Sequence, residues 1–459
     1  MKILIISQQW EPEEGTPQRR WAQLCRSLIQ AGNEVDVIAA PPHYPGGQLT
    51  SDAPEHQPGA VATGNHGETV WRTSFRPHGR SLVSRVLDQG IVALSSLRVG
   101  IKVAKLTRPD VILTTAPPIP STVVAALVAF RTHLPFVVDL RDVWPDLLRH
   151  MNDWGNLAES NPQNRLKARA FDVLISVGGW VFVRGLKRAD AIITTTPSFA
   201  EKLRNEGRHH VLNLRNMASV REQSVPSLAL TAYLDGYDRE NGTLRVLYAG
   251  TTGRAQGLDN ALDAVRLATE AGVDIELRVV GSGASLRRLQ LHAERENLPV
   301  EFLGRIPFDE VIEEYEWCDT ALVHLRDWTP LEYAVPSKLY ETLSVGRHVT
   351  VAANGEAARI ASETGAGVAV PAMDARALAD AWIELAQNRE QLEVSDRGRR
   401  WLLDRETPEQ NADKFSDFVV RTVLAHRDRK WSVAKVRSHL QKTLSSRSQS
   451  FANAKRYSQ

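Results

Sequence analysis

The chain has 459 residues, a length that favours two domains over one or three. Apolar residues make up 42% of the chain and charged residues 24%, and both shares are ordinary for a soluble globular protein. The formal net charge of +2 creates no overall field that would favour nucleic acid, so no nucleic-acid partner is expected. The two cysteines, Cys25 and Cys318, lie far apart without metal-ligand spacing, which indicates reduced thiols in a cytosolic protein.

The start of the chain reads as a β-strand and not as a targeting signal. Residues 2–7 form an apolar run that ends at the polar residues Gln8 and Gln9, and this run is too short for a signal peptide. No stretch approaches the roughly twenty apolar residues that a membrane-spanning helix needs. We therefore expect a cytoplasmic protein, whose attachment to the inner face of the cell membrane, if any, is peripheral.

Strand and helix patterns alternate in the first half of the chain. Apolar runs at residues 2–7 and 35–39 flank a segment at 19–31 whose apolar residues recur at helical spacing. Further strands are predicted at 69–75, 109–114, 136–140, 189–195 and 211–215, and helices at 82–106, 122–130 and 198–206. This alternation is typical of a parallel sheet covered by helices on both faces.

Glycine and charged residues follow two of these strands. Gly15 lies in the loop after the first strand, and Arg19 and Arg20 follow it at the start of a helix, where they could reach an anion. Arg141 and Asp142 come directly after the strand at 136–140. Open α/β sheets bind ligands at the carboxyl ends of their strands, so a site role is favoured for these residues. An Arg–Asp pair that only holds a loop is the alternative.

Three segments could contact a membrane surface. The apolar run at 173–183 is flanked by basic residues, a pattern that fits a helix at an anionic membrane or a core helix packed on the sheet. Residues 82–106 have helical spacing with basic residues interleaved. Residues 426–459 contain nine Lys and Arg residues against one Asp, and they read as a flexible tail that is either solvated or attracted to anionic lipid.

A second α/β pattern begins after residues 216–242, which have no clear periodicity. Its strands are predicted at 244–249, 275–280, 300–303, 320–324, 348–352 and 367–370, and its helices at 258–271, 284–297, 309–317, 355–362 and 375–388. Gly250, Gly253, Gly281 and Gly283 follow its first two strands, and glycine lets backbone N–H groups approach a phosphate closely. Arg254 adds a positive charge beside them.

Residues 328–346 form a loop that becomes a helix. Pro336 suits a first helical position, which places Ser337 and Lys338 beside backbone N–H groups without intrahelical partners. Such a helix start binds anions, and Lys338 adds a full positive charge. Glu341 follows one turn later on the same face, so a nucleotide would fit with its phosphates at the helix start and its ribose at Glu341. A capped amphipathic helix without a ligand is the alternative.

Several motifs together resemble a known family. They are WEPEEG at 10–15 with Arg20, DLRDVWP at 139–145, YAG at 248–250 with AQG at 255–257, VGSG at 280–283, FLG at 302–304 and PSKLYE at 336–341. The chain resembles the retaining GT-B glycosyltransferases of family 4, within the bacterial envelope-polysaccharide branch that includes N-acetylfucosamine transferases. The resemblance extends to about residue 425 and implies an α/β fold with two Rossmann-like parallel-sheet domains facing a central cleft.

The domain plan combines the two α/β patterns with this resemblance. It consists of an acceptor-side domain at 1–215, a linker at 216–242, a nucleotide-sugar-binding domain at 243–406, a helix at 407–425 that crosses back to the first domain, and the basic tail at 426–459.

The resemblance also implies roles for single residues. Glu341 would hold the ribose hydroxyls of the nucleotide-sugar donor, and Lys338 would face its diphosphate. The other donor-binding residues would be Gly250, Thr251, Gly253, Gly281, Gly283, Ser337 and Leu339. On the acceptor or sugar side we expect Gly15, Arg20, Trp328, Glu332 and Tyr333. The family needs no metal and no cofactor, because the nucleotide-sugar is a co-substrate, and the lack of an Asp-x-Asp triplet agrees with this.

Three positions depart from the family's pattern. Tyr333 stands where the family often has the first of two glutamates, and Glu332 is the nearest acid. Gln256 replaces the usual lysine of the first diphosphate loop, so Lys338 and Arg254 must supply the positive charge there. Arg141 stands where the family commonly has a histidine.

The expected reaction is transfer, with retention, of a hexosyl or N-acetylhexosaminyl group from a nucleoside diphosphate sugar, with UDP as the expected nucleotide. The acceptor would be a cell-envelope glycan or a lipid-linked glycan. Catalysis is expected to rest on Lys338, Arg254, Arg141 and Asp142. One alternative is a UDP-sugar 2-epimerase of the same architecture, which would act without an acceptor. Another is a catalytically silent homologue that binds partners in envelope synthesis, which donor hydrolysis or transfer would exclude.

Overall fold

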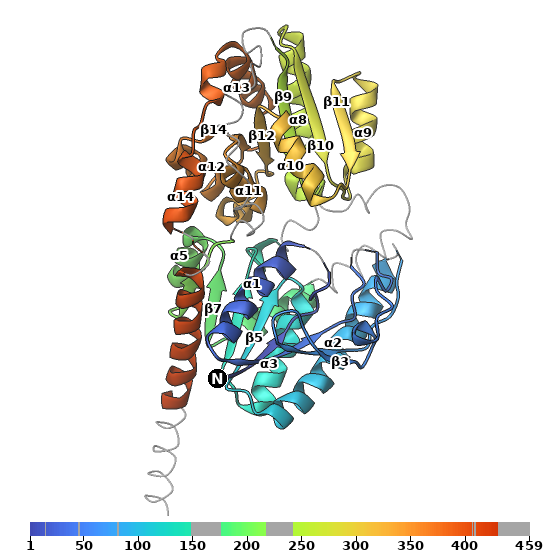
Figure 1. Cartoon of the computed structure of the whole chain (residues 1–459), viewed down its shortest axis with the longest axis vertical. Helices are drawn as coiled ribbons and strands as arrows, with labels where there is room; N and C mark the ends of the chain where they lie inside the picture. The colour runs from blue at the N-terminus through green and yellow to red at the C-terminus, as the bar shows by residue number, and fades with distance from the viewer. Residues whose placement is uncertain are drawn as a thin grey trace, which may run out of the picture.

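The chain forms two α/β domains, which lie one above the other in Figure 1. The computed structural model describes residues 1–13, 15–44, 46–79, 82–147, 176–216, 242–405, 407 and 410–429. Most of the predicted linker, at 217–241, and most of the predicted tail, at 430–459, lie outside the described residues. The predicted apolar segment 173–183 is described only from residue 176, where it is helical.

The first domain is built on an eight-stranded sheet with the order β3-β4-β2-β1-β5-β6-β7-β8. Its strands are β1 (Lys2–Ile6), β2 (Glu34–Ala39), β3 (Val61–Thr63), β4 (Thr69–Arg72), β5 (Val111–Ala116), β6 (Phe136–Leu140), β7 (Ala191–Thr194) and β8 (Val211–Asn213). All pairings are parallel except that of β3 with β4. The helices are α1 (Thr16–Gln30), α2 (Leu82–Thr107), α3 (Ile119–Thr132) and α5 (Pro197–Asn205).

The second domain has a six-stranded, all-parallel sheet with the order β11-β10-β9-β12-β13-β14. Its strands are β9 (Leu244–Ala249), β10 (Ile275–Val280), β11 (Val300–Gly304), β12 (Thr320–His324), β13 (His348–Ala352) and β14 (Gly367–Val370). Its helices are α8 (Asp259–Glu270), α9 (Leu286–Arg295), α10 (Phe308–Trp317), α11 (Ser337–Val345), α12 (Glu356–Thr364), α13 (Ala375–Gln387) and α14 (Arg397–Arg405). The predicted fold class, two α/β domains with parallel sheets, is confirmed.

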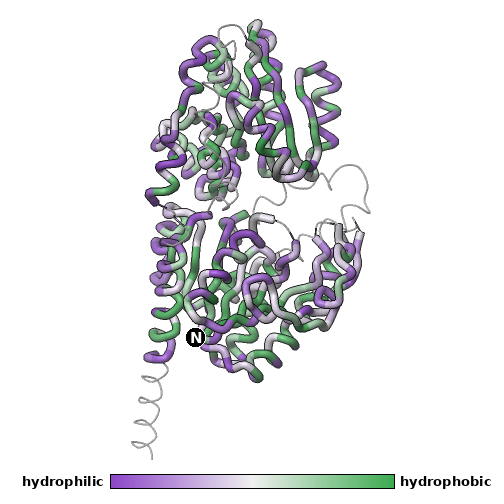
Figure 2. The backbone as a smooth tube through the Cα atoms, in the orientation of Figure 1, coloured by the Kyte–Doolittle hydropathy of each residue, from purple (hydrophilic) through white to green (hydrophobic). Residues whose placement is uncertain are grey.

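Burial on both faces explains why the central strands are apolar throughout. Every residue of β5 and β6 is buried, and alternate residues face different cores: Ile112 lies in one apolar cluster and Leu113 in another. The strands accordingly carry long green stretches in Figure 2, whereas a peripheral helix such as α9 is banded purple and green. Among the described residues, no helix is long and apolar enough to cross a membrane.

The last described helix, residues 410–429, packs on the first domain, beside α5 in Figure 1. Its Phe415 is fully buried and meets the Trp21 ring of α1 edge-on, with 6.4 Å between the ring centroids. The helix continues beyond the predicted end at residue 425. In this extra turn, Arg429 Nη2 donates to Asp190 Oδ1 of the first domain at 2.6 Å.

Three details differ from the sequence patterns. The strand β3 has only three residues, too few for a periodic signal. The helix α14 is so rich in charged residues that its apolar face is short, comprising chiefly Trp401 and Leu402. Pro336 precedes α11 as its N-cap, with an extended backbone (φ −60°, ψ 138°), so the helix begins at Ser337 and not at the proline.

Candidate active site

The carboxyl end of β9 and the start of α11 bring Lys338, Tyr248 and Gly250 together. The Lys338 Nζ donates to the Tyr248 hydroxyl at 2.9 Å and lies 4.3 Å from the centroid of that ring. The hydroxyl in turn donates to the Thr251 carbonyl at 2.7 Å. A Cβ atom on Gly250 would lie only 2.3 Å from Nζ, so a larger residue there would push the ammonium group away from the loop.

The glycines after β9 and β10 pack the two loops against each other. A Cβ atom on Gly281 would lie 1.9 Å from the Gly250 carbonyl oxygen, and one on Gly283 would lie 2.4 Å from the Thr252 carbonyl oxygen. The Gly250 N–H already donates to the Val280 carbonyl at 2.8 Å. These glycines are expected to let a phosphate approach the backbone, and in the structure their small size lets the two loops approach each other.

The short 3₁₀ helix η3 (Arg254–Gln256) follows this loop, with Gly253 as its N-cap. The Arg254 side chain is exposed, and its carbonyl accepts from Arg326 Nε at 2.8 Å. The Arg326 backbone N–H donates to the Ala255 carbonyl at 2.9 Å. Arg326 therefore ties the end of β12 to the turn that presents Arg254.

The buried side chain of His324 holds the same turn in place. The His324 Nδ1 lies 2.6 Å from the Gln256 carbonyl oxygen, and its Nε2 lies 2.9 Å from Asn260 Nδ2. Burial lowers the pKa of His324 to about 4, so the ring is neutral near pH 7. A neutral ring that donates from Nδ1 and accepts at Nε2 satisfies both partners. The backbone of Gln256 is thus held in place.

The first turns of α11 present groups with different surroundings. Ser337 is half-buried, whereas the Leu339 side chain is fully buried and its N–H donates to the Pro336 carbonyl at 3.0 Å. The Leu339 side chain therefore supports the helix from inside, and its expected contact with the donor stays a prediction. Glu341 is 18% exposed, and its Oε1 lies 3.5 Å from Arg19 Nη2 on α1 of the first domain.

The two domains touch at the same end of α11. The Thr196 hydroxyl of the first domain donates to the Tyr333 carbonyl of the second at 2.7 Å, and the Tyr333 ring packs against the first domain's apolar cluster. Nearby, Arg215 Nη1 lies 3.2 Å from Glu356 Oε1, and both side chains are buried. Tyr333, expected on the sugar side, thus lies at the domain contact.

Arg20, which is expected on the acceptor side, is buried and paired within the first domain. Its Nε and Nη2 donate to the two carboxylate oxygens of Asp139, at 3.1 and 2.9 Å. Its Nη1 donates to the Arg215 carbonyl at 3.1 Å. The guanidinium is only 4% exposed and has partners on both edges, so in this structure Arg20 joins α1 to β6.

Two more residues expected on the sugar side, Trp328 and Glu332, have structural contacts near α11. Trp328 is buried in the apolar cluster of the second domain, so it supports the loop before α11 from the core. Glu332 is half-buried on η4 (Thr329–Tyr333), and its carbonyl presses against Gly355, where a Cβ atom would lie 2.1 Å away. The glycine at 355 is therefore required by this close approach.

Arg141 and Asp142 lie at the carboxyl end of β6. Arg141 Nε donates to the Thr115 hydroxyl at 3.0 Å, and Nη2 donates to the Pro117 carbonyl at 2.6 Å. Burial raises the pKa of Asp142, and the neighbouring Arg141 charge opposes this shift. These bonds support the alternative in which Arg141 holds the loop after β5.

Gly15 caps α1 with an extended backbone (φ 176°), so it needs no left-handed conformation.

Three residues at the junction, Tyr248, Arg215 and Glu356, were not identified from the sequence as site residues, whereas Arg19 was expected to reach an anion. Tyr248 is part of the YAG motif at 248–250, but only the folded chain reveals that its hydroxyl orients Lys338. Arg19, Arg215 and Glu356 pair across the domains, and no local pattern identifies such partners. A charged residue at a buried strand end, such as Arg215 after β8, is the one available signal.

Two family models together match most of the chain. The glycosyl transferase 4-like domain matches residues 15–213, and the glycosyl transferases group 1 model matches residues 235–401. By family, the chain is a glycosyltransferase of group 1. This glycosyltransferase is 26% identical over 365 residues to the putative colanic acid biosynthesis glycosyl transferase WcaI of Escherichia coli (strain K12), covering 77% of the chain and 83% of WcaI. It is also 26% identical over 305 residues to the probable glycosyltransferase WbjE of Pseudomonas aeruginosa, covering 65% and 72%.

Solved structures share the fold of this glycosyltransferase. Sucrose-phosphate synthase from Thermosynechococcus elongatus superimposes with a TM-score of 0.67 at 17% identity, over 92% of the chain and 99% of that structure. Anabaena HepE in complex with UDP-glucose gives a TM-score of 0.61 at 14% identity, over 92% and 100%. WaaG, a glycosyltransferase involved in lipopolysaccharide biosynthesis, gives 0.59 at 14% identity, over 89% and 98%. The fold is therefore GT-B.

Proposed function

We propose that this glycosyltransferase moves a hexosyl or N-acetylhexosaminyl group, with retention, from a UDP-linked sugar to a cell-envelope glycan or lipid-linked acceptor. The observation that carries the proposal is Lys338, held by Tyr248 over the β9 loop at the start of α11. WcaI's description as a colanic acid glycosyl transferase supports an envelope acceptor. The complex of HepE with UDP-glucose supports a UDP-linked donor.

The proposed chemistry separates charge between the sugar and the leaving diphosphate. As the bond from the anomeric carbon to the phosphate oxygen breaks, the sugar gains positive charge and the diphosphate gains negative charge. Lys338, the exposed Arg254 and the N-terminus of α11 supply positive potential beside the diphosphate, without a metal ion there. The acceptor hydroxyl attacks the same face and gives its proton to the leaving phosphate, which retains the configuration.

Glu341 is the proposed partner of the ribose hydroxyls. In the structure its carboxylate faces Arg19, whose side chain is 46% exposed, at 3.5 Å. Ion pairs as exposed as this one contribute at most about 1 kcal/mol. Ribose hydroxyls could therefore replace Arg19 at Glu341 with little loss of free energy.

A thermal-shift experiment without added metal tests the donor site. The purified glycosyltransferase is melted with UDP, GDP, ADP or dTDP, and UDP is expected to raise Tm most, because a ligand that binds only the folded state stabilises it. Glu341→Ala is expected to lose this shift. The shift corresponds to about 2.7 kcal/mol at a hundredfold excess of UDP over its Kd.

Arg19→Ala is the matched control for Glu341→Ala. It removes the same contact between the domains but keeps the carboxylate, so the UDP-dependent shift should persist. Loss of the shift in both variants would show that the contact, and not the carboxylate, matters. No shift with any nucleotide would argue against the proposed donor site.

We also propose that the first domain attaches peripherally to an anionic membrane surface. Phe130 on α3 and Trp180 are each 63% exposed. The Arg188 guanidinium lies 4.9 Å from the Phe130 ring centroid, and that of Arg184 lies 5.6 Å from the Trp180 ring. Aromatic rings beside arginine side chains suit the boundary between lipid tails and anionic headgroups.

Removing residues 430–459 is expected to weaken binding to phosphatidylserine-containing vesicles by about tenfold or more. The segment holds seven Lys and Arg residues and no acidic residue, and each basic residue near an anionic surface contributes about 1 kcal/mol. The cut at 430 spares Arg427 and Arg429, which pair with Asp110 and Asp190. Vesicle co-sedimentation measures the change, and a full-length chain with the seven residues changed to Gln controls for tail length. Equal binding by all three proteins would contradict a role for the tail.

A further inference from the structure

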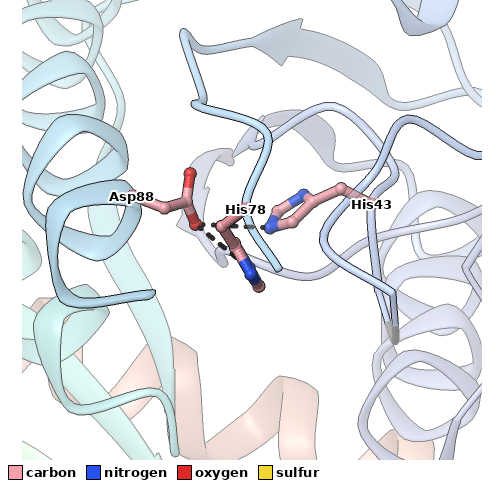
Figure 3. Close-up of side chains that lie close together, drawn as sticks. All are labelled: His43, His78 and Asp88. Atoms are coloured by element: carbon pink, nitrogen blue, oxygen red, sulfur yellow. Dashed lines mark ion pairs between the residues drawn. The ribbon is translucent and has the colours of Figure 1, made fainter. Parts of the chain in front are cut away.

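Two histidines and an aspartate meet in the first domain, apart from the residues assigned to the donor. His43 follows β2, His78 follows β4, and Asp88 lies on α2, so three segments distant in sequence converge (Figure 3). Asp88 Oδ2 lies 3.6 Å from His43 Nε2 and 3.9 Å from His78 Nε2. The three ligand atoms all lie within 4.8 Å of one another.

The hydrogen bonds around the cluster fix which ring nitrogens face inward with lone pairs. His43 Nδ1 lies 2.7 Å from the Pro41 carbonyl oxygen, and His78 Nδ1 lies 3.1 Å from the Gly79 carbonyl oxygen. A carbonyl only accepts, so each Nδ1 carries the proton, and each neutral ring has its lone pair on Nε2. Metal-binding histidines commonly have this arrangement, with the second nitrogen donating to a backbone carbonyl.

The carboxylate of Asp88 is buried and only half satisfied. Its Oδ1 accepts from the Arg76 backbone N–H at 2.9 Å, whereas Oδ2 is buried without a hydrogen-bond partner. The distances from Oδ2 to the two imidazoles exceed hydrogen-bond length. The Asp88 side chain is fully buried, and an unpaired buried carboxylate oxygen is costly unless a cation compensates it.

We propose that His43 Nε2, His78 Nε2 and Asp88 Oδ2 bind a divalent transition-metal cation of the zinc class. Bonds of about 2.0–2.1 Å in tetrahedral geometry place ligand atoms about 3.3 Å apart, so the three atoms, which lie up to 4.8 Å apart, would move closer together around the cation, and a water molecule would occupy the fourth position. Two neutral imidazoles and one carboxylate suit zinc and its first-row neighbours, whereas magnesium and calcium prefer oxygen ligands. The cation reaches the site past His78, whose side chain is 13% exposed.

The cation fastens two loops to α2. The His78 backbone N–H donates to the Gly47 carbonyl at 2.8 Å, and the Gly47 N–H donates to the His43 carbonyl at 2.7 Å, so the loops are already joined to each other. Their shared bond to Asp88 would anchor them to the helix. Because the loop after β2 leaves the carboxyl edge of the sheet, the metal would order the acceptor side of the first domain and take no part at the diphosphate.

Metal titration of the full chain tests the proposal. The protein is stripped with chelator and titrated with Co²⁺, followed by displacement with Zn²⁺. We expect one Co²⁺ per chain, visible d–d absorption bands, and a rise in Tm with Zn²⁺. His78→Ala and Asp88→Asn are expected to bind Co²⁺ about 100-fold more weakly or not at all. Asp88→Asn keeps the oxygen that accepts from Arg76, so it guards against loss of binding through misfolding.

His209→Ala is the matched control, because His209 is exposed and lies outside the cluster. It should bind Co²⁺ as the parent chain does. Absence of stoichiometric binding by the parent chain would overturn the proposal. Unchanged binding in His78→Ala and Asp88→Asn would overturn it as well, because the ion would then lie elsewhere.

Discussion

Replacing Lys338 with alanine is expected to lower kcat by about 10²–10³-fold, the usual effect of removing one preorganised group that stabilises charge in a transition state. The Nζ lies against Gly250 and is held by the Tyr248 hydroxyl, so the ammonium is oriented before any donor arrives. Its attraction grows as the diphosphate leaves, and the loss should therefore fall on kcat more than on KM. Initial rates of UDP release at saturating donor measure the change.

Two further variants bracket this result. Tyr248→Phe keeps the charge on Lys338 but removes the hydroxyl that orients it, so a smaller loss of about tenfold is expected. Lys414→Ala removes an exposed lysine on the last helix and should leave the rate unchanged. A Lys338→Ala enzyme that folds normally and keeps more than a tenth of the parent kcat would argue against the proposed role of this charge.

Arg20→Ala is expected to destabilise the first domain by about 3–5 kcal/mol, the usual effect of removing one partner of a buried ion pair. The change leaves the Asp139 carboxylate, which is 0% exposed, without the two donors that Arg20 provides. It also removes the donor to the Arg215 carbonyl. Urea denaturation followed by circular dichroism should show the first-domain transition at a lower urea concentration.

The double variant Arg20→Met with Asp139→Leu distinguishes two causes of lost stability. One is the loss of the ion pair, and the other is the burial of an unpaired Asp139 carboxylate. Replacing both partners with apolar residues of similar size is often close to neutral, so much of the lost stability should return. If the double variant were as unstable as Arg20→Ala, the geometry of the pair itself would be the stabilising feature. A loss below about 1 kcal/mol in Arg20→Ala would mean that water reaches Asp139 in the folded state.

The fold could be predicted because most of its strands and helices have a recognisable local sequence pattern. Apolar runs such as β5 are buried on both faces, and helices such as α8 carry apolar residues at regular spacing. Failures occurred where an element is short, as in β3, or where charge hides a narrow apolar face, as in α14. The predicted helical position of Pro336 was wrong by one residue: Pro336 is the N-cap of α11 and not its first helical residue.

The site could be predicted only in part, since partner choice is a matter of tertiary structure. The sequence predicts Lys338 at a helix start and Gly250 in a loop, and the structure shows that the Lys338 side chain lies against Gly250. It does not reveal that Arg20 is committed to Asp139, or that Trp328 is part of the core. A charged or aromatic residue near a strand end has the same local pattern whether it faces a ligand or the protein interior.

The helix at 410–429 has a consequence for how the chain reaches its final form. The Phe415 ring covers Trp21 near the beginning of the chain, so a face of the first domain is closed by residues that are synthesised after the whole second domain. A ribosome-bound chain that ends at residue 405 still exposes this apolar face. The first domain is thus the last part of the chain to be completed. Until residues 410–429 are synthesised, the apolar face around Trp21 is available for a chaperone to bind.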